Sequence, residues 1–599
     1  MSYSTTDHRN PDACPTSSSR RAFWLATAIA LVTFAVFYPV LKHGFVFWDD
    51  DVFILKNADL DPPTLSSLAR FWGNPLVGYK QFLVPLNYTV WWALAHVARI
   101  PLQIDDRSVL IAPAFHAVNL GCHVAAAALA FLLLRKLVKS DVAAAVGALF
   151  FALHPLQAEP VSWAANMYTT LSGALALAAL YAYLCSSDPG RGFRARVFLF
   201  ALGTLCYVLG LLSKPSIVLL PLIAVTIELL LRGRRLRACA PLAVWLLIGV
   251  TDAFLTHHIH SGAQAFPTPF WQRPFVAADA LTFYLGKALV PLNLIPDYGR
   301  TPVRVLQHKA TYLVWLAPVA ALLLCVRFRR RLPWLLCGMI VFVLGVLPML
   351  GLAPFDFQGF STVADRYLYL SLFGGAILVA FATRHVAPVV ARSRLRATAV
   401  AAPLVVLVFF AAASRKQVNY WEDTGTLFHH TLAVNPNSEV AHLQLGYVLM
   451  NRGGAPELEE ALDHYLTALE FRGAEPPLLC NLSVVLRKLG KPAEAVPFLA
   501  EASRRAPAEI PIAFMLADTR AEAGDLKGAV DGFSRILQSH PGYADAELHL
   551  ARLLAQAHDS RGAAAHYRNY LAAHPTSAEA RAALSRKAGP PLQAATDGR

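Results

Sequence analysis

The sequence predicts an all-α protein in which a polytopic helical membrane domain is followed by an α-solenoid. The 599 residues are 56% hydrophobic and only 15% charged, a composition typical of proteins that cross the membrane several times. In the last quarter of the chain, alanines and prolines recur every 34 residues: Ala461, Ala495, Ala529 and Ala563, and Pro507, Pro541 and Pro575. A fixed period of this length is the signature of tetratricopeptide repeats, which stack pairs of helices into a curved solenoid.

Other residues keep the same period within the repeats. Leucines that precede a small residue, and aromatic residues four positions after a period alanine, recur in phase: Leu482, Leu516 and Leu550, and Tyr465, Phe533 and Tyr567. The small residues let two helices approach closely, and each aromatic ring fills the gap between repeats. We therefore expect four full repeats up to about residue 580, after a leading helix at 422–434, with the first repeat lengthened near Gly453 and Gly454.

Composition also predicts where the domains begin and end. We expect four segments: a disordered cytoplasmic tail (1–19), a transmembrane domain (20–420), a tetratricopeptide repeat domain (421–585) and a flexible tail (586–599). The apolar stretch 22–41 has no convincing cleavage site after it, so we interpret it as a retained first helix. The eight cysteines are scattered without metal-ligand spacing, which supports neither a disulfide framework nor a zinc site.

Basic clusters beside the apolar stretches predict the topology, because such clusters stay on the cytoplasmic side of a membrane. They lie at Arg135–Lys139, Arg191–Arg196, Arg232–Arg237, Arg327–Arg331 and Arg392–Arg396. Placing all of them inside, with the N-terminus, leaves the C-terminus outside and gives eleven spans: 22–41, 109–134, 142–157, 169–185, 197–213, 216–231, 239–256, 311–326, 332–352, 367–383 and 397–414. The formal net charge of +14 is therefore a topological signal, and we expect no nucleic-acid partner.

The apolar stretch 275–295 is a candidate for a twelfth span. Counting it would place Arg327–Arg331 outside, so we expect a re-entrant or interfacial segment instead. With eleven spans, the repeats and four polar segments all lie on the outer side: 42–108, 154–168, 257–310 and 353–366. We therefore expect the chemistry on that side, with 42–108 as the catalytic loop.

Three adjacent carboxylates, those of Asp49, Asp50 and Asp51, follow the first predicted helix and two aromatic residues. At the edge of a membrane they are electrostatically costly unless they share a cation or a proton. One carboxylate can act as general base toward an acceptor hydroxyl, while a neighbour orients the base or holds a metal. We predict Asp49 and Asp50 as the catalytic pair, and Asp50 and Asp51 as candidate ligands of Mg or Mn. The alternative is a solvated acidic loop or a helix cap.

His154 and Glu159 lie five residues apart in a turn bracketed by Pro155 and Pro160. Both side chains can face one cavity at the outer end of the third predicted span. The alternative is an ordinary turn at the membrane boundary, with Trp163 at the interface.

Lys214 and Arg366 are cations near the predicted outer surface, against the bias of basic residues toward the cytoplasm. Such cations need an anion, and a lipid-linked phosphate is the natural candidate. The alternative is a salt bridge of Arg366 with Asp365 or Asp356.

The second predicted span has a polar face made by His116, Asn119 and His123, at spacings of three and four residues. Polar residues inside a span usually face the bundle interior or a cavity. We expect either a cavity wall or hydrogen bonding within the bundle.

An ordered set of motifs runs along the chain: Trp48-Asp49-Asp50, Phe115-His116, His154-Pro155 with Glu159, Leu212-Ser213-Lys214-Pro215, Phe283-Tyr284-Leu285 with Pro291 and Tyr298, and Asp365-Arg366-Tyr367-Leu368-Tyr369. Together with the repeats, this order resembles the membrane O-mannosyltransferases with transmembrane and tetratricopeptide regions, and their bacterial relatives. The resemblance covers roughly residues 22–580. Where relatives often carry a basic–acidic pair after the His-Pro-Glu motif, this chain has Asn166-Met167-Tyr168-Thr169.

The resemblance implies a GT-C glycosyltransferase in a bacterial inner membrane, with its active site and repeats on the periplasmic side. Such an enzyme moves a mannose-like sugar from a polyprenyl-phosphate donor to a protein hydroxyl. The donor phosphate or its cavity would involve five residues: Lys214, Arg366, His154, Glu159 and Tyr369. Membrane lipid and a protein or peptide acceptor, held by the repeats, are the expected partners. No Gly-rich phosphate-binding motif of a nucleotide-sugar enzyme is present in the sequence.

Two other classes of protein are compatible with the sequence. A membrane-anchored repeat scaffold without enzyme activity would gather an assembly for envelope polysaccharide or glycoprotein, and the acidic loop would be merely polar. A transporter would carry charges in mid-span and internal pseudo-repeats, and neither pattern is clear in this chain.

Overall fold

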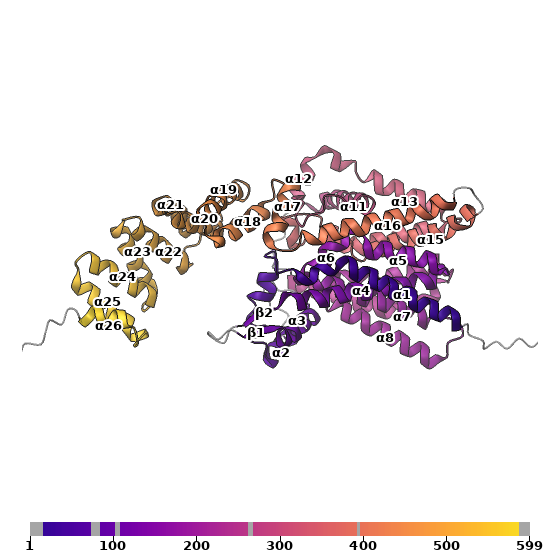
Figure 1. Ribbon diagram of the computed structural model, residues 1–599, viewed down its shortest axis with the longest axis horizontal. Coiled ribbons are helices and arrows are strands. Elements are labelled where there is room, and N and C mark those ends of the chain that lie inside the picture. The colour runs from indigo at the N-terminus through magenta and orange to yellow at the C-terminus, as the bar shows by residue number, and fades with distance from the viewer. Residues whose placement is uncertain (1–15, 74–83, 102–107, 261–267, 392–395, 586–599) are drawn as a thin grey trace, which may run out of the picture. The chain divides into compact units, whose positions relative to one another are not determined.

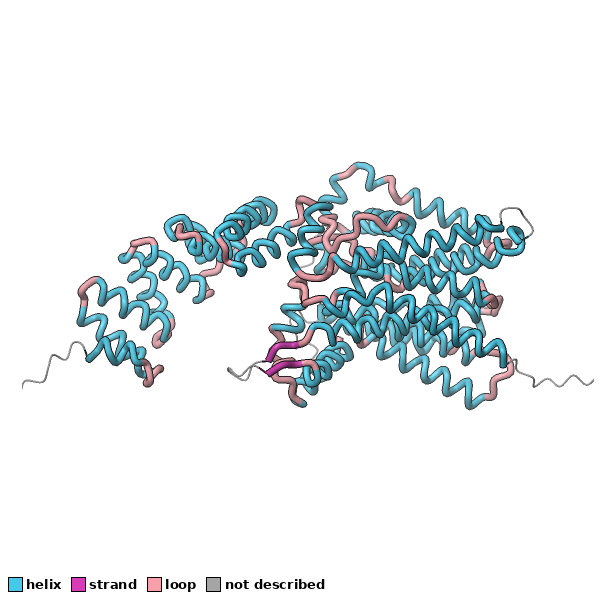
Figure 2. The backbone as a smooth tube through the Cα atoms, in the orientation of Figure 1, coloured by secondary structure: helices cyan, strands magenta, loops and turns pink. Residues whose placement is uncertain are grey.

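The structure is a computed structural model that describes residues 16–73, 84–101, 108–260, 268–391 and 396–585. The chain folds into two compact units, Met1–Pro436 and Asn437–Arg599. The predicted tails lie outside the described residues, except for residues 16–19, which already belong to the first helix. Helices make up nearly all of the regular structure that is described (Figure 2), so the predicted all-α class is confirmed.

The first unit contains the long apolar helices, which run alongside one another as a bundle (Figure 1). They are α1 (Thr16–Phe37), α4 (Ala112–Val138), α5 (Asp141–Leu153), α6 (Ala158–Ser162), α7 (Met167–Ser186), α8 (Phe193–Leu211), α9 (Leu220–Leu230), α10 (Leu242–His260), α13 (Leu316–Phe328), α14 (Pro333–Val346), α15 (Leu372–Ala391) and α16 (Arg396–Asn419).

Shorter elements occupy the connections of the first unit. Helices and strands there are α2 (Leu65–Gly73), α3 (Pro85–Val97), β1 (Arg99–Pro101), β2 (Ser108–Leu110), α11 (Arg273–Leu289), α12 (Pro302–Gln307) and α17 (Thr424–Val434), and the two strands pair antiparallel. The remaining turns are η1 (Tyr38–Lys42), η2 (Asp51–Leu55), η3 (Pro155–Gln157), η4 (Ala164–Asn166), η5 (Pro215–Leu219), η6 (Leu236–Cys239), η7 (Phe270–Gln272), η8 (Lys309–Tyr312), η9 (Leu347–Met349), η10 (Asp356–Gly359) and η11 (Asp365–Leu368).

Each range predicted to cross the membrane coincides with a helix or a bent pair of helices. Among the described residues, six helices are long and apolar enough to cross: Arg20–Lys42, Ala112–Val138, Ala164–Ser186, Phe193–Leu211, Lys309–Phe328 and Ala401–Asn419. A seventh candidate is the pair Asp141–Leu153 and Pro155–Ser162, bent by 50°. Shorter apolar helices occupy the other predicted ranges: Pro215–Leu230, Leu242–Thr256, Pro333–Met349 and Leu372–Val386. The stretch 275–295 falls mostly in α11, which is not among these candidates.

The core of the first unit lies where α4, α5, α7, α14 and α15 pack together. Many of its buried side chains are alanines, and small residues at such contacts let membrane helices approach closely. The start and end of α5 illustrate how nearby residues determine where a helix begins and ends. At its start, the Ser140 side chain accepts a hydrogen bond from Ala143 N–H. The helix ends at Leu153 because the next residue, His154, precedes Pro155, and a residue before proline disfavours the helical conformation. The bundle thereby supports the irregular segments that carry the polar side chains.

The second unit consists of helix pairs. They are α18 (Glu439–Arg452), α19 (Ala455–Arg472), α20 (Pro476–Lys488), α21 (Pro492–Arg505), α22 (Ile510–Glu522), α23 (Leu526–Ser539), α24 (Ala544–Gln556), α25 (Ser560–Ala573) and α26 (Ala578–Ser585). The period alanines are buried, and a Cβ on Gly446 would lie only 2.7 Å from the Tyr465 ring, as the small–aromatic packing requires. The insertion lengthens α19 to 18 residues, against 14 in α21, α23 and α25. The predicted α-solenoid is confirmed.

Candidate functional site

The carboxylate of Asp50 is fully buried and is used to hold two segments together. Its Oδ2 accepts a hydrogen bond of 2.8 Å from Val46 N–H, and its Oδ1 accepts one of 2.7 Å from Ala165 N–H. These bonds tie the loop after α1 to η4. Burial raises the pKa of Asp50 to about 7, although the two backbone hydrogen bonds act in the opposite direction. Asp50 is therefore placed to position the acidic loop.

Asp49 and Asp51 are partly exposed and have different surroundings. Asp51 Oδ2 accepts a hydrogen bond of 2.8 Å from Lys56 Nζ, an exposed ion pair of the kind that contributes little to stability. Burial is the main reason why the pKa of Tyr367 rises to about 12; Arg366 opposes the rise and the negative charge of Asp49 adds to it. Asp49 is thus the member of the acidic cluster that lies in electrostatic contact with a tyrosine next to Arg366.

The structure gives no support to a metal site at the acidic cluster. Among the described residues, no group of three or more His, Cys, Asp or Glu side chains has a metal-binding arrangement. The candidate ligands Asp50 and Asp51 bond to backbone N–H groups and to Lys56. A requirement for Mg or Mn stays a prediction.

Aromatic rings surround the acidic loop on its buried side. The Trp48 ring lies 6.3 Å from the rings of Trp163 and Phe357 and 5.8 Å from that of Phe428 in α17. Phe47 N–H donates to Thr424 Oγ1, also in α17, at 2.9 Å. The helix that we expected at 422–434 therefore belongs to the first unit and fixes the loop that carries Asp49.

Glu159 and Arg366 form a buried ion pair. Glu159 Oε1 lies 2.5 Å from Arg366 Nη1, and Glu159 Oε2 accepts a hydrogen bond of 3.1 Å from Arg366 N–H. The guanidinium also lies 4.2 Å from the centre of the Phe357 ring. Burial alone would lower the pKa of Arg366, but Tyr367 and Glu159 hold it above its usual value. The salt bridge considered from the sequence exists, with Glu159 in place of Asp365 or Asp356.

Lys214 is a partly buried cation without an acidic partner. Its Nζ donates to Thr169 Oγ1 at 2.8 Å and lies 5.1 Å from the centre of the Tyr168 ring. Within the described part of the chain, no carboxylate lies within 4.0 Å of Nζ. Burial lowers the pKa of Lys214 to about 7, the positive charge of Arg366 adds to this effect, and Glu159 opposes it. Lys214 can therefore accept an anion as its counter-charge.

Lys214, Arg366 and Tyr369 line one small cavity. Its volume is about 20 Å³, room for a single water molecule, and it is lined by Thr169, Ser172, Gly173, Lys214, Ser216, Ile217, Gly345, Met349, Arg366, Tyr367, Tyr369 and Leu370. The Tyr369 ring lies so close to Gly173 that a Cβ there would overlap it. The structure thus brings together three of the predicted donor residues, in a cavity that must widen to admit a sugar phosphate.

His154 and Glu159 do not face the same partner. His154 Nε2 lies 3.1 Å from the carbonyl of Ala288 in α11, so it donates, and Nδ1 accepts a hydrogen bond of 3.3 Å from Leu156 N–H. Both ring nitrogens are used within the fold. The prediction that the two side chains share a cavity is not supported, because the bend after His154 directs them to different neighbours.

The polar face of α4 binds the turn that follows α5. Asn119 Nδ2 donates to the carbonyls of Pro160, Val161 and Trp163. His123 Nε2 donates to the carbonyl of Ala152, so its Nδ1 accepts a hydrogen bond of 3.0 Å from Tyr369 Oη. His116 Nε2 lies 3.1 Å from the carbonyl of Gly44. These residues hold the site in place through hydrogen bonds within the bundle.

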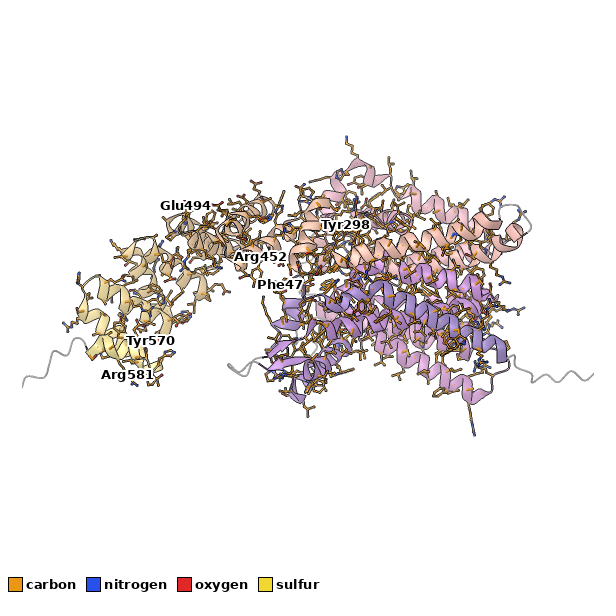
Figure 3. All side chains as sticks on the ribbon, in the orientation of Figure 1. Phe47, Tyr298, Arg452, Glu494, Tyr570 and Arg581 are labelled. Carbon is orange, nitrogen blue, oxygen red and sulfur yellow. The ribbon has the colours of Figure 1, made fainter. Side chains whose placement is uncertain are left out.

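Two further contacts near the site could not be predicted from local sequence patterns. Thr169 Oγ1 accepts from Lys214 and donates to Asn166 Oδ1 at 2.6 Å, within the segment where this chain departs from its relatives. Tyr298 Oη donates to Asp365 Oδ1 at 2.8 Å and so joins the loop after α11 to η11. Tyr298 is labelled in Figure 3. The Lys214–Thr169 pair and the Tyr298–Asp365 pair each connect segments far apart in the chain. Tyr298 and Asp365 belong to the ordered motif set, but no local pattern indicated that they contact each other.

Comparison with known proteins finds similarity along most of the chain. It is 24% identical over 519 residues to the human protein O-mannosyl-transferase TMTC3, covering 78% of this chain and 54% of that protein. The Drosophila melanogaster protein O-mannosyl-transferase Tmtc3 is 24% identical over 557 residues, 80% of this chain and 58% of the relative. The resemblance inferred from the ordered motifs is confirmed: the chain is homologous to these proteins. It spans about half the length of the curated relatives it matches, and no family model matches it.

Solved structures add weak similarities. ArnT from Cupriavidus metallidurans, solved bound to undecaprenyl phosphate, is 15% identical, with 81% of this chain and 80% of that chain covered and a TM-score of 0.31. YrrB, described as a tetratricopeptide repeat protein with an unusual peptide-binding site, is 20% identical over 31% of this chain and 91% of its own, with a TM-score of 0.26. TM-scores this far below 0.5 do not establish a common arrangement.

Proposed function

We propose that this protein is a membrane glycosyltransferase that moves a mannose-like sugar from a polyprenyl-phosphate donor to a protein hydroxyl. The observation that carries the proposal is Lys214, a cation without a carboxylate partner among the described residues, in one cavity with Arg366. Phosphate is the anion that two such cations suit best. The homology to protein O-mannosyltransferases supports the sugar and the protein acceptor.

The chemistry needs a general base and a binding site for the leaving phosphate. In our proposal Asp49 takes the proton from the acceptor hydroxyl, and the hydroxyl oxygen forms the bond to the anomeric carbon. The bond from that carbon to the phosphate oxygen breaks, and the electron pair leaves with the polyprenyl phosphate, which Lys214 and Arg366 stabilise. A single in-line displacement of this kind inverts the anomeric centre. Asp50 positions the loop through its bonds to Val46 and Ala165.

The donor would reach this cavity from within the membrane. The cavity is lined by η5, η11 and the start of α7, next to helices that are long and apolar enough to cross a membrane. We propose that these segments lie on the outer face, periplasmic in a bacterial inner membrane, because the basic clusters occupy the opposite connections of the chain. We also propose that the repeats bind the protein acceptor and raise its local concentration.

Transfer of radiolabelled mannose from a polyprenyl-phosphate donor, measured in membranes that contain the protein, tests the proposal. Wild-type protein should label an acceptor protein, and Lys214→Met and Asp49→Asn should label it much more weakly at the same donor concentration and equal protein abundance. Equal labelling by all three would overturn it. No labelling above that of membranes without the protein, by any of the three, would favour the non-enzymatic scaffold, which predicts unchanged envelope assembly in both variants.

A further inference from the structure

A second cavity, of about 450 Å³, lies along α11 and is separate from the cavity of Lys214. It is lined by Asp279, Thr282, Phe283, Gly286, Lys287, Val290, Leu292 and Arg300. None of these residues lines the cavity of Lys214. The volume lies in the range of small-molecule sites in proteins. We call it the α11 cavity.

The charged side chains of the α11 cavity are two cations and one carboxylate. Lys287 Nζ donates to the carbonyls of Leu292 and Asn293, at 2.5 and 3.1 Å. Burial lowers the pKa of Lys287, and the negative charge of Asp365, which does not line the cavity, opposes this effect. Arg300 Nη2 donates to Asp279 Oδ2 at 2.5 Å, while Arg300 Nε is buried without an acceptor. The net charge of the lining is therefore positive, and the guanidinium has donors to spare. Such a lining favours an anion.

Both cations are held against one aromatic ring. Lys287 Nζ lies 5.4 Å and Arg300 Cζ 5.2 Å from the centre of the Phe283 ring. α11 and the loop after it supply all three groups, and all three line the α11 cavity. Two cations that line one cavity suit a phosphate, which offers several acceptor oxygens to them.

Exposed apolar side chains flank the cavity at both ends of α11. Phe270 and Trp271, just before the helix, are 81% and 62% exposed, and Leu289 and Val290, at its end, are 81% and 58% exposed. The helix itself carries charges and is not among the candidate spans. Exposed aromatic and aliphatic residues on a charged, non-spanning helix are typical of an element that lies in the membrane interface. The mouth of the cavity would then meet lipid headgroups.

We propose that the α11 cavity binds the phosphate headgroup of an anionic bilayer phospholipid. Lys287 and Arg300 hold the phosphate, and Val290 and Leu292 contact the start of the acyl chains. This site goes beyond the proposed sugar transfer, which uses Lys214 and Asp49. The bound lipid would anchor α11, and α11 in turn contacts His154 through the carbonyl of Ala288.

The test is a lipid titration of the purified full-length chain, followed by native mass spectrometry. The probes are phosphatidylglycerol, phosphatidylcholine, a polyprenyl phosphate and inorganic phosphate. Wild-type protein should bind phosphatidylglycerol at least tenfold more tightly than phosphatidylcholine or inorganic phosphate. Lys287→Gln and Arg300→Gln should each weaken phosphatidylglycerol binding about tenfold. The control Arg304→Gln removes an exposed cation from α12 that does not line the cavity, and should change the affinity less than twofold.

Asp279→Asn separates binding from damage to the fold. It removes the carboxylate of the described lining that pairs with Arg300, so phosphatidylglycerol should bind more tightly, whereas a misfolded cavity would bind it less. Weaker binding by Asp279→Asn at an unchanged melting temperature, or unchanged binding by both Lys287→Gln and Arg300→Gln, would overturn the proposal. Stronger binding of polyprenyl phosphate than of phosphatidylglycerol, lost in the same variants, would also overturn it by making this the donor site. Lys214→Met should leave phosphatidylglycerol binding unchanged. The lipid-site proposal and the sugar-transfer proposal can therefore each be refuted without the other.

Discussion

Glu159 contacts Arg366 at two points, through the guanidinium at 2.5 Å and through the backbone N–H at 3.1 Å. The two residues lie in α6 and η11, 207 positions apart in the sequence, and both side chains are about 5% exposed or less. This contact fixes η11 against α6, and it places Arg366 beside the cavity that Lys214 lines. The site is thus assembled from the ends of helices in the bundle, and its parts respond differently to substitution.

Glu159→Gln should destabilise the protein strongly. It leaves the buried Arg366 without its counter-charge, and breaking a buried ion pair by removal of one partner costs about 3–5 kcal/mol. The apparent melting temperature of the purified protein in detergent should fall by several degrees. Glu422→Gln, which changes an exposed carboxylate of the same unit, should leave it unchanged. Equal melting temperatures for Glu159→Gln and wild type would contradict the structural role of the pair.

Lys214→Met should raise the KM for the lipid donor by about tenfold or more, because a charge-assisted contact to phosphate contributes about 1.5–3 kcal/mol. Lys214→Arg should recover part of the affinity. Initial rates at a series of donor concentrations measure this, and Lys309→Met, which removes an exposed lysine, is the control. A normal KM in Lys214→Met would remove Lys214 from the donor site.

The pH dependence of donor use follows from the lowered pKa of Lys214. With a pKa of about 7 in the free protein, the ammonium loses its proton as the pH rises from about 6 to 8, and only the charged form attracts phosphate. The ratio kcat/KM for the donor should therefore fall over this range. Lys214→Arg stays charged and should flatten this limb of the profile. A profile that is identical in wild type and Lys214→Arg would assign the titration to another group.

The three adjacent aspartates should give three different results. Asp49→Asn should lower kcat by about two to four orders of magnitude, the typical loss of a general base, at normal abundance. Asp50→Asn offers a single acceptor oxygen to two buried N–H groups, so it should destabilise the fold by about 1–3 kcal/mol. Asp51→Asn loses an exposed pair with Lys56 and should change neither quantity much. Transfer rates and melting temperatures of the three variants check this order. A normal kcat in Asp49→Asn would show that Asp49 is not the general base. An unchanged melting temperature in Asp50→Asn would show that Asp50 does not hold the loop in place.

Removal of the repeats should separate acceptor recruitment from chemistry. A chain that ends at Pro436 keeps α17, whose Thr424 bonds to Phe47, and should still transfer sugar to a short peptide but not to a full-length acceptor protein. A chain that ends near residue 420 loses α17 and should lose both activities, because Trp48 then lacks the Phe428 ring. Undiminished transfer to full-length acceptor by the chain that ends at Pro436 would show that the repeats do not recruit it.

Periodic features of this fold could be predicted from the sequence, and contacts between distant turns could not. The spacing of the period alanines predicted the helix pairs, and apolar length with basic flanks predicted the bundle, because both are local patterns. The partner of Arg366 could not be found in this way. The nearby Asp365 and Asp356 were the local candidates, but Asp365 bonds to Tyr298, and Glu159 arrives from a bend whose direction depends on packing. The burial of Asp50 likewise depends on η4, a segment 115 residues away.

The most direct test of the account is sugar transfer from a radiolabelled polyprenyl-phosphate mannose to an acceptor peptide, with wild type, Asp49→Asn and Lys214→Met reconstituted at equal amounts in vesicles. The account predicts that Asp49→Asn loses kcat at an unchanged KM for the donor, whereas Lys214→Met raises that KM. Transfer by both variants at wild-type kcat and KM would contradict it.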